Sequence, residues 1–288
     1  MKKIVYIGSR QNCLKALQDR TKYEIVRIYA EEGTRLATRA DVIFTKKDKE
    51  EIFEQLKTMN YDILVSNGCP FILPASELIS QGKMLINTHP TYLPHLRGAT
   101  PLNGVLYKGY SFMGATTHYI SDKIDAGNII YQEKVDVTED IDLGLVYEVS
   151  FTMEEVVFCK AMAILEENNF QYEGHPMSIS EGCYFNRSVE KRTIDIINDN
   201  IETCIRKIKA FGLHSQGALI TIDDTDYKLY SAERIVNPFL LKLYSKQEIG
   251  KICLKYDDNM IIKLIDGIIK VTKYTEEART TGGENLNC

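Results

Sequence analysis

Two polar side chains stand one residue apart in the segment LINTHPTYLPHLRGATP, residues 85–101, and they are Asn87 and His89. On a strand, residues two apart face the same side, so both side chains can point at one spot. An Asn amide donates hydrogen bonds without titrating, and His donates as an imidazolium or accepts when neutral. The pair therefore suits an oxyanion that forms during attack on a carbonyl.

The neighbours of this pair favour a rigid loop, and a third polar residue could complete the site. Pro90 biases the residue before it toward an extended conformation, and Pro94 stiffens the next turn. Asp125 lies in the segment SDKIDAGNIIYQ, and an aspartate beside His89 would orient the ring and accept a proton. The alternative is structural: Asn87 caps a turn, His89 is half-buried, and the aspartate belongs to an ordinary D-x-G turn. These residues alone leave both interpretations open.

Other chemistries have weaker support in the sequence. His89, His95 and His118 could form a zinc set, but the prolines keep the first two off a common helix and no cysteine stands at ligand spacing, so we expect no metal. The segment GSRQNC lacks the G-x-G-x-x-G pattern of dinucleotide folds, which favours a tight strand-to-helix turn at Gly8. A helix N-terminus there could still hold one phosphate or carboxylate. The G-x-S-x-G pattern of serine hydrolases is absent.

The elements that would carry these residues alternate between strand and helix. The strand-like segments are 3–9, 24–30, 41–45, 62–68 and 83–89, and the helical ones are 11–20, 46–59 and 74–82. This alternation predicts βαβ units and a mostly parallel, Rossmann-like α/β sheet. Two adjacent strands, 114–120 and 128–137, and a long helix, 143–167, follow. Asn87 and His89 then fall at the carboxyl end of a strand, where open α/β sheets bind ligands.

A second unit is expected after residue 190. A helix from Thr193 to Phe211 would open it, and its inward face would carry the isoleucines Ile194, Ile197, Ile201, Ile205 and Ile208. Five short strands broken by Asp, Asn and Gly turns follow, which predicts a small β-rich, barrel-like fold. We therefore expect a catalytic domain at 1–185, a C-terminal domain at 190–275 and a flexible tail at 276–288.

Composition excludes several classes of protein. The 288 residues carry a net charge of −5, so no global basic field indicates a nucleic-acid partner. The sequence contains no run of eighteen or more apolar residues, so we expect no membrane helix. Seven cysteines without a C-x-x-C pair are typical of free thiols in a reducing cytoplasm.

The two polar segments together resemble the active-site pattern of the folate-dependent formyltransferase family. That pattern is N-x-H-P-[ST]-x-L-P-x-x-R-G followed about three dozen residues later by D-x-G-x-[IV], and here the separation of His89 and Asp125 is 125 − 89 = 36 residues. The resemblance implies transfer of a formyl group from 10-formyltetrahydrofolate, the co-substrate, to an amine. It also implies that Asn87 and protonated His89 stabilise the tetrahedral oxyanion, while Asp125 keeps His89 charged and helps to remove the amine proton.

The resemblance also assigns binding residues. The pterin would lie against backbone in the segment CPFILP, and the turn that ends at Asp125 would form the other wall. The cofactor residues are then Phe71, Ile72, Leu73, Ser121, Asp122 and Ile124. The expected acceptor residues are Arg10, Arg97, Gly98 and Thr100. Thr100 and Pro101 look like the N-cap and first position of a helix that could hold a diphosphate beside Arg97, although Arg97 could equally brace its loop.

The family includes enzymes that act on glycinamide ribonucleotide, methionyl-tRNA and sugar nucleotides, and a hydrolytic deformylase. The unit after residue 190 argues against the single-domain purine enzyme, and the deformylase carries its extra domain at the N-terminus. Residues 190–275 hold fourteen Lys and Arg against twelve Asp and Glu, a net of 14 − 12 = +2, which is low for a tRNA-binding module.

We therefore expect a UDP- or dTDP-linked amino sugar as acceptor, in the biosynthesis of lipopolysaccharide or another surface glycan. Methionyl-tRNA formylation is the alternative, and a non-catalytic folate- or nucleotide-binding relative is a third interpretation. The expected setting is cytoplasmic, without a nucleic-acid or membrane partner. The oligomeric state stays open, a homodimer included.

Overall fold

The computed structural model describes residues 1–18 and 21–277, and Cα packing divides the chain into two compact units. The N-terminal unit comprises Met1–Leu102, Ser111–Glu139 and Val146–Asn186, and the C-terminal unit comprises Asn103–Tyr110, Asp140–Leu145 and the chain from Arg187 on. No helix within the described part of the chain is long and apolar enough to span a membrane.

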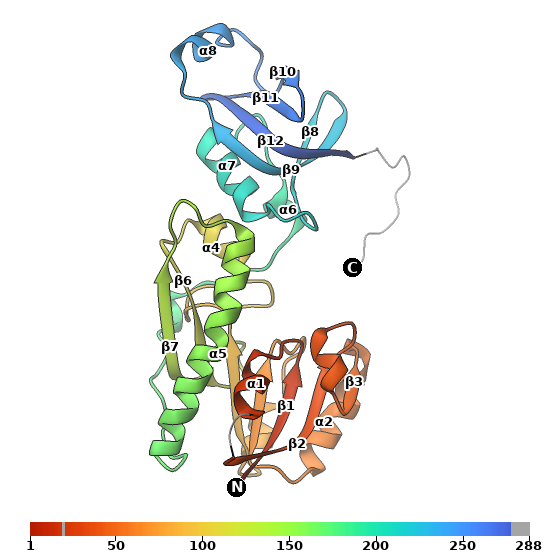
Figure 1. The fold of residues 1–288 in the computed structure, drawn as a ribbon, viewed down its shortest axis with the longest axis vertical. Helices are drawn as coiled ribbons and strands as arrows, with labels where there is room; N and C mark the ends of the chain where they lie inside the picture. The colour runs from red at the N-terminus through yellow and green to blue at the C-terminus, as the bar shows by residue number, and fades with distance from the viewer. Residues whose placement is uncertain (19–20, 278–288) are drawn as a thin grey trace. The chain divides into compact units, whose positions relative to one another are not determined.

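The N-terminal unit is built on a seven-stranded sheet in the order β3-β2-β1-β4-β5-β6-β7 (Figure 1). The first five strands are parallel, and β6 and β7 run antiparallel to their neighbours. The strands are β1 Lys2–Gly8, β2 Tyr23–Glu31, β3 Val42–Phe44, β4 Ile63–Asn67, β5 Met84–His89, β6 Phe112–Tyr119 and β7 Ile129–Asp136. The expected mostly parallel α/β sheet is confirmed.

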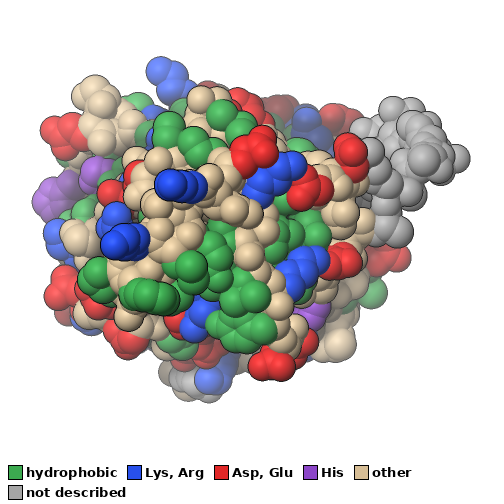
Figure 2. Space-filling model, turned by 90° about the horizontal axis from the view of Figure 1, so that it is seen from above, with side chains coloured by type: hydrophobic (Ala, Val, Ile, Leu, Met, Phe, Trp, Pro, Cys, Tyr) green, Lys and Arg blue, Asp and Glu red, His purple; other side chains and the backbone are tan. Residues whose placement is uncertain are grey.

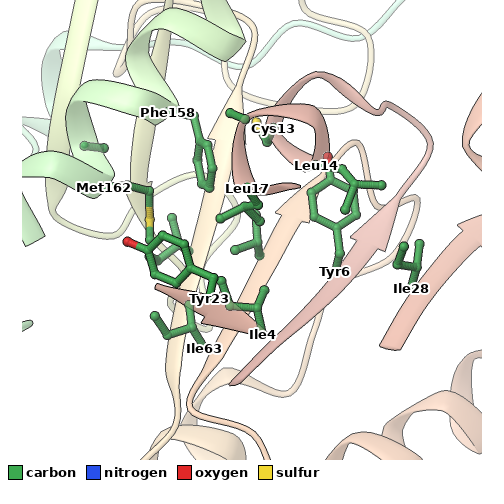
Figure 3. Close-up of a cluster of buried hydrophobic side chains, with 14 of the residues drawn as sticks. Ile4, Tyr6, Cys13, Leu14, Leu17, Tyr23, Ile28, Ile63, Phe158 and Met162 are labelled. Carbon is green, nitrogen blue, oxygen red and sulfur yellow. The ribbon is translucent and has the colours of Figure 1, made fainter. Parts of the chain in front are cut away.

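Helices cover both faces of this sheet because its central strands are apolar on both sides. The helices are α1 Asn12–Gln18, α2 Lys49–Thr58, α3 Ala75–Ile79 and α5 Leu143–Glu167, and single 3₁₀ turns lie at Arg35–Arg39, Lys46–Asp48 and Ile179–Glu181. On one face, Ile4 and Tyr6 of β1 pack with Leu17 of α1 and with Phe158 and Met162 of α5 (Figure 3).

The residues of β1 between these, Val5 and Ile7, point to the opposite face of the sheet. Val5 and Ile7 belong to a second buried cluster, which includes Ile52 of α2 and Leu78 of α3. This alternation of side chains with a period of two is what the strand pattern of residues 3–9 predicts. The sheet is therefore held rigid from both sides, which fixes the carboxyl ends of its strands.

The C-terminal unit contains a five-stranded antiparallel sheet in the order β10-β11-β12-β9-β8. Its strands are β8 Ala218–Ile222, β9 Thr225–Arg234, β10 Ile252–Tyr256, β11 Asn259–Leu264 and β12 Gly267–Glu277, and its helices are α4 Asn103–Lys108, α6 Val189–Arg192, α7 Ile201–Ala210 and α8 Pro238–Leu243. The expected β-rich character is confirmed, and the sheet is open, with β10 and β8 as its edges. The first two residues of the expected tail at 276–288 belong to β12, and 278–288 lie outside the described residues.

The single helix expected from Thr193 to Phe211 is wrong. Thr193 forms a bridge with Leu219, and the next residue, Ile194, donates its backbone N–H to the Leu219 carbonyl at 2.8 Å. The Asp195 carboxylate accepts backbone N–H groups of the following turn at 3.1 Å. Such side-chain bonds to backbone compete with a helix. Ile197, expected to point inward, is consequently 52% exposed.

The C-terminal unit also exposes apolar side chains around α8. Val236 is 73% exposed, Phe239 is 72% exposed and Leu243 is 57% exposed. Figure 2 looks down on the end of Figure 1 where α8 lies, and it shows hydrophobic side chains gathered among Lys and Arg on that face.

A close contact between β1 and β4 shapes the end of the N-terminal sheet. The Asn67 carbonyl accepts the backbone N–H groups of Ser9 at 3.1 Å and Arg10 at 3.3 Å. A Cβ on Gly8 would lie 2.0 Å from this oxygen, and the φ of Gly8 is +153°. Only glycine therefore fits at the end of β1, as the expected tight turn requires.

This contact predicts the effect of Gly8→Ala on stability. Gly33→Ala is a matched control, because Gly33 also has a positive φ, +76°, but a Cβ there meets nothing within 4 Å. We expect Gly8→Ala to lower the free energy of unfolding by about 1–3 kcal/mol more than the control does, since its Cβ overlaps backbone. Urea unfolding followed by circular dichroism measures both. Equal losses of unfolding free energy in Gly8→Ala and Gly33→Ala would contradict a close contact between Gly8 and the Asn67 carbonyl.

Candidate active site

A cavity of about 440 Å³ opens at the carboxyl ends of β1, β4 and β5 in the N-terminal unit. Here the sheet has its switch point, because β2 lies on one side of β1 and β4 lies on the other. Open α/β sheets bind ligands at such a point. The volume falls in the range of about 300–1,000 Å³ that is usual for small-molecule sites.

The structure brings Asn87, His89 and Asp125 together in the wall of this cavity. The first two lie at the end of β5 and face the same side. Asp125 lies on the turn between β6 and β7 with a φ of +47°, and its Oδ1 is 3.5 Å from Nδ1 of His89. His118 of β6, which we expected to have no metal role, joins them: its Nε2 is 3.1 Å from Nδ2 of Asn87 and 3.8 Å from the Asp125 Oδ1.

His89 is 5% exposed, and oxygen atoms lie at both of its ring nitrogens. Nδ1 faces the Asp125 carboxylate, and Nε2 is 3.1 Å from the Leu96 carbonyl. The Thr91 hydroxyl donates to the same carbonyl at 3.1 Å, which holds the loop after β5 in place. A doubly protonated His89 ring can donate to both oxygens at once.

The Asp125 carboxylate is held in its ionised form. Burial raises its pKa, but electrostatic interactions with His89 and His118, the backbone N–H of Gly98 and the charge of Arg97 together bring the pKa below its usual value. The Gly98 N–H donates to Oδ2 at 3.0 Å. The cavity thus contains one fixed negative charge beside the imidazole of His89.

Phe71, Ile72 and Leu73, the expected folate contacts, line the cavity. The ring of Phe71 packs against Phe44 and Phe53 with centroid separations of 5.4 and 5.6 Å, which fixes the loop after β4. Ile72 is 53% exposed, so its surface is open to a ligand.

On the opposite wall, Ser121 and Ile124 line the cavity, but Asp122 does not. Asp122 instead accepts the backbone N–H of Ser76 at 3.0 Å and also the Ser76 hydroxyl. These bonds lower the pKa of Asp122. Because Ser76 lies in the first turn of α3, directly after the 71–73 segment, Asp122 ties the two walls of the expected folate slot together.

Arg10 also reaches the cavity, where it is anchored to α5. Its Nε and Nη2 donate to the two carboxylate oxygens of Glu154 at 2.9 and 2.7 Å, and Glu154 is fully buried. The remaining nitrogen, Nη1, lies beside Gly68, where a Cβ would be 2.6 Å away. A bidentate pair of this kind fixes the guanidinium plane.

Gly98 and Thr100 line the cavity, but the Arg97 side chain does not. Arg97 is 6% exposed; its guanidinium lies 4.2 Å from the ring centroid of Tyr184 and donates to the Ile179 carbonyl at 3.5 Å. It therefore braces its loop. The expected helix start at Thr100 and Pro101 is also wrong, because α4 begins at Asn103.

Several cavity residues had no signal in the sequence. Glu31, Lys46 and Ser66 come from separate loops and strand ends, and no motif connects them. Their common position becomes apparent only from the strand order. In the described part of the chain, no group of three or more His, Cys, Asp and Glu side chains could hold a metal ion.

The low pKa of Asp125 predicts the acid sensitivity of the fold. A carboxyl whose folded pKa lies below its unfolded value of about 3.9 adds stability above that value and loses it as the pH falls through the folded pKa. Asp125→Asn cannot titrate. We therefore expect its free energy of unfolding to fall less between about pH 5 and pH 3 than that of the parent.

Urea unfolding at several pH values measures this slope. The control is Asp136→Asn, an exposed carboxyl at the end of β7, which should keep the parent's slope. If Asp125→Asn kept the parent's pH dependence of the free energy of unfolding, the neighbours of the Asp125 carboxylate would not stabilise its ionised form.

Comparison with known proteins identifies related enzymes. A family model described as Formyl transferase matches residues 2–162. The chain is 25% identical over 228 residues to a methionyl-tRNA formyltransferase of Clostridioides difficile, a match that covers 78% of this chain and 70% of that enzyme. A methionyl-tRNA formyltransferase of Staphylococcus aureus is 26% identical over 191 residues, and the match spans 60% of its length and 66% of this chain.

Solved structures share the fold. One is an N-formyltransferase of Helicobacter canadensis in complex with folinic acid and dTDP-3-aminofucose, which superposes with a TM-score of 0.68 at 18% identity. The match covers 96% of this chain and the whole of that enzyme. HypX of Aquifex aeolicus in complex with tetrahydrofolic acid superposes with a TM-score of 0.63 at 20% identity. That match covers 96% of this chain but only 44% of HypX. Because the family model covers more than half of the chain, the protein belongs to the formyl transferase family.

Proposed function

We propose that this formyltransferase moves the formyl group of 10-formyltetrahydrofolate to the amine of a nucleotide-linked amino sugar, UDP or dTDP, for lipopolysaccharide or another surface glycan. The observation that carries the proposal is the position of Asn87, His89 and Asp125 in the wall of a single cavity. That cavity is also lined by the folate segment at 71–73 and by Arg10.

In the first step, the acceptor amine attacks the formyl carbon, a C–N bond forms, and the carbonyl oxygen becomes an oxyanion. Asn87 can donate a hydrogen bond to this charge from the end of β5. Both ring nitrogens of His89 face protein oxygens, so His89 supports the charge from the adjacent cavity wall rather than through a free N–H. Donors that are fixed before the reaction stabilise the charge without reorganisation. The antiparallel and parallel neighbours of β5 hold that strand end in place.

In the second step, the tetrahedral intermediate collapses and the bond from carbon to N10 breaks, which leaves tetrahydrofolate. The attacking nitrogen loses one proton and N10 gains one. Asp125 is ionised and lies 3.5 Å from His89, so it can accept the amine proton directly or through a water. Its second oxygen, bonded to the Gly98 N–H, keeps the carboxylate turned toward His89.

Arg10 supports a phosphate-bearing acceptor. Two nitrogens of the Arg10 guanidinium donate to Glu154, and the third nitrogen remains beside the cavity wall at Gly68. A charged guanidinium held in one plane suits a diphosphate oxygen. The solved relative that binds a dTDP-linked amino sugar matches this chain over nearly its whole length, which supports a sugar nucleotide as acceptor.

Methionyl-tRNA is the second candidate acceptor, because the curated relatives with 25–26% identity are methionyl-tRNA formyltransferases. Against it stands the charge of residues 190–275, which is only 14 − 12 = +2. A module that contacts many phosphates needs a larger basic surface.

The catalytic assignment predicts that Asn87→Ala and Asp125→Ala fold but lose most activity. Removal of one oxyanion donor costs roughly 100- to 1,000-fold in kcat. Formyl transfer is measured by mass spectrometry, and thermal unfolding checks the fold. Asn168→Ala, an exposed change at the end of α5, is the control and should keep the parental rate. A folded Asn87→Ala enzyme within a few-fold of the parent would remove this residue from the reaction.

The acceptor class is tested by substrates and salt. UDP- and dTDP-amino sugars and methionyl-tRNA are each incubated with 10-formyltetrahydrofolate, and their affinities are measured from low to physiological salt. We expect one amino sugar to gain a formyl group and its affinity to fall only mildly with salt, since few phosphates are contacted. Formylation of methionyl-tRNA with steeply salt-dependent binding would instead support the second candidate.

A further inference from the structure

The side chain of Asn87 presents two different groups of nearly the same shape. Its nitrogen donates hydrogen bonds and its oxygen accepts them, so a half-turn of the amide would exchange a donor for an acceptor at the cavity. An oxyanion needs the donor. A neighbour of Asn87 must therefore decide which end of the amide faces the reacting carbonyl.

His118 is the neighbour in position to do this. The β5–β6 register places it directly opposite Asn87, and partners across an antiparallel pair share one face of the sheet. It is 2% exposed, it lines the same cavity, and its Nε2 is 3.1 Å from the Asn87 Nδ2. Its other contact in the site, the Asp125 Oδ1 at 3.8 Å, is too long for a hydrogen bond.

The protonation of His118 follows from its surroundings. Nδ1 is 2.8 Å from the Tyr119 carbonyl, which can only accept, so Nδ1 carries the hydrogen. Burial lowers the pKa of His118, the Asp125 charge raises it, the His89 charge lowers it and the Tyr119 bond raises it, and the sum lies below the ordinary value. His118 is therefore neutral near pH 7, and Nε2 holds a lone pair. That lone pair accepts one N–H of Asn87.

We propose that His118 is a positioning residue for formyl transfer: its neutral imidazole holds one N–H of the Asn87 amide, so that the second N–H faces the reacting carbonyl. The inference rests on the proposed formyl transfer. The Tyr119 carbonyl fixes the tautomer of His118, His118 fixes the amide of Asn87, and Asn87 meets the oxyanion. A charge on His118 is disfavoured by its burial and by the neighbouring His89.

Two substitutions separate this role from a packing role. His118→Leu keeps a buried side chain but removes the acceptor, and His118→Gln offers an amide oxygen near the place of Nε2. We expect His118→Leu to lower kcat roughly tenfold, the cost of about one hydrogen bond, with little change in the KM for 10-formyltetrahydrofolate. His118→Gln should recover most of that loss.

A double-mutant cycle tests whether His118 acts through Asn87. In an Asn87→Ala background, His118→Leu should change kcat by less than about twofold, because the group it positions is gone. Additive losses in the double variant would overturn the proposal. So would a His118→Gln enzyme as slow as His118→Leu.

Nitrogen NMR of the labelled protein tests the same inference without catalysis. At neutral pH, we expect His118 to carry hydrogen on Nδ1 only, and the Nε2 resonance to shift in Asn87→Ala. A protonated Nε2, or no response to Asn87→Ala, would overturn the proposal. If the parent formylates no acceptor while the NMR result holds, the proposed reaction fails and the Asn87–His118 contact stands.

Discussion

The antiparallel pairing of β5 with β6 is the constraint on which the site depends. It places Asn87 opposite His118, while the parallel pairing with β4 places Ser66 on the other side of the same residue. A slip of one residue would turn every side chain of β5 to the opposite face and remove Asn87 and His89 from the cavity together. The β6–β7 turn then returns toward β5, and the positive φ of Asp125 lets its carboxylate reach His89.

Around this centre, side chains that could be mistaken for ligand-binding groups hold the walls together. Asp122 is bonded to Ser76 and joins the β6–β7 turn to α3. Arg97 packs on Tyr184 and keeps its backbone in place beside Asp125, whose charge it also favours. A reaction that depends on donors fixed in advance needs walls of this kind, because a displacement of about 1 Å can cost a hundredfold in rate.

Much of this arrangement could be predicted from the sequence because it is local. The alternation of strand and helical segments predicts the parallel strands, and the resemblance of the two polar segments to the formyltransferase pattern predicts a shared site for Asn87, His89 and Asp125. The positions of His118 and Lys46 at the cavity could not be predicted in this way, since they depend on which strands are neighbours. Arg97 was ambiguous for the same reason, because its partner Tyr184 is 184 − 97 = 87 residues away. The predicted helix at 193–211 failed where bonds from Asp195 to its local backbone outweigh helical periodicity.

The central claim is that Asn87 and His89 meet the formyl oxygen in a cavity that also receives the acceptor. A crystal structure of the ternary complex with an inert 10-formyl folate analogue and a nucleotide-linked amino sugar tests it most directly. The account predicts the formyl oxygen within hydrogen-bond distance of the Asn87 amide nitrogen, the pterin against residues 71–73, and the sugar amine facing the formyl carbon beside Asp125. A formyl group bound away from Asn87 and His89, with the amine on the far side of the cavity from Asp125, would contradict it.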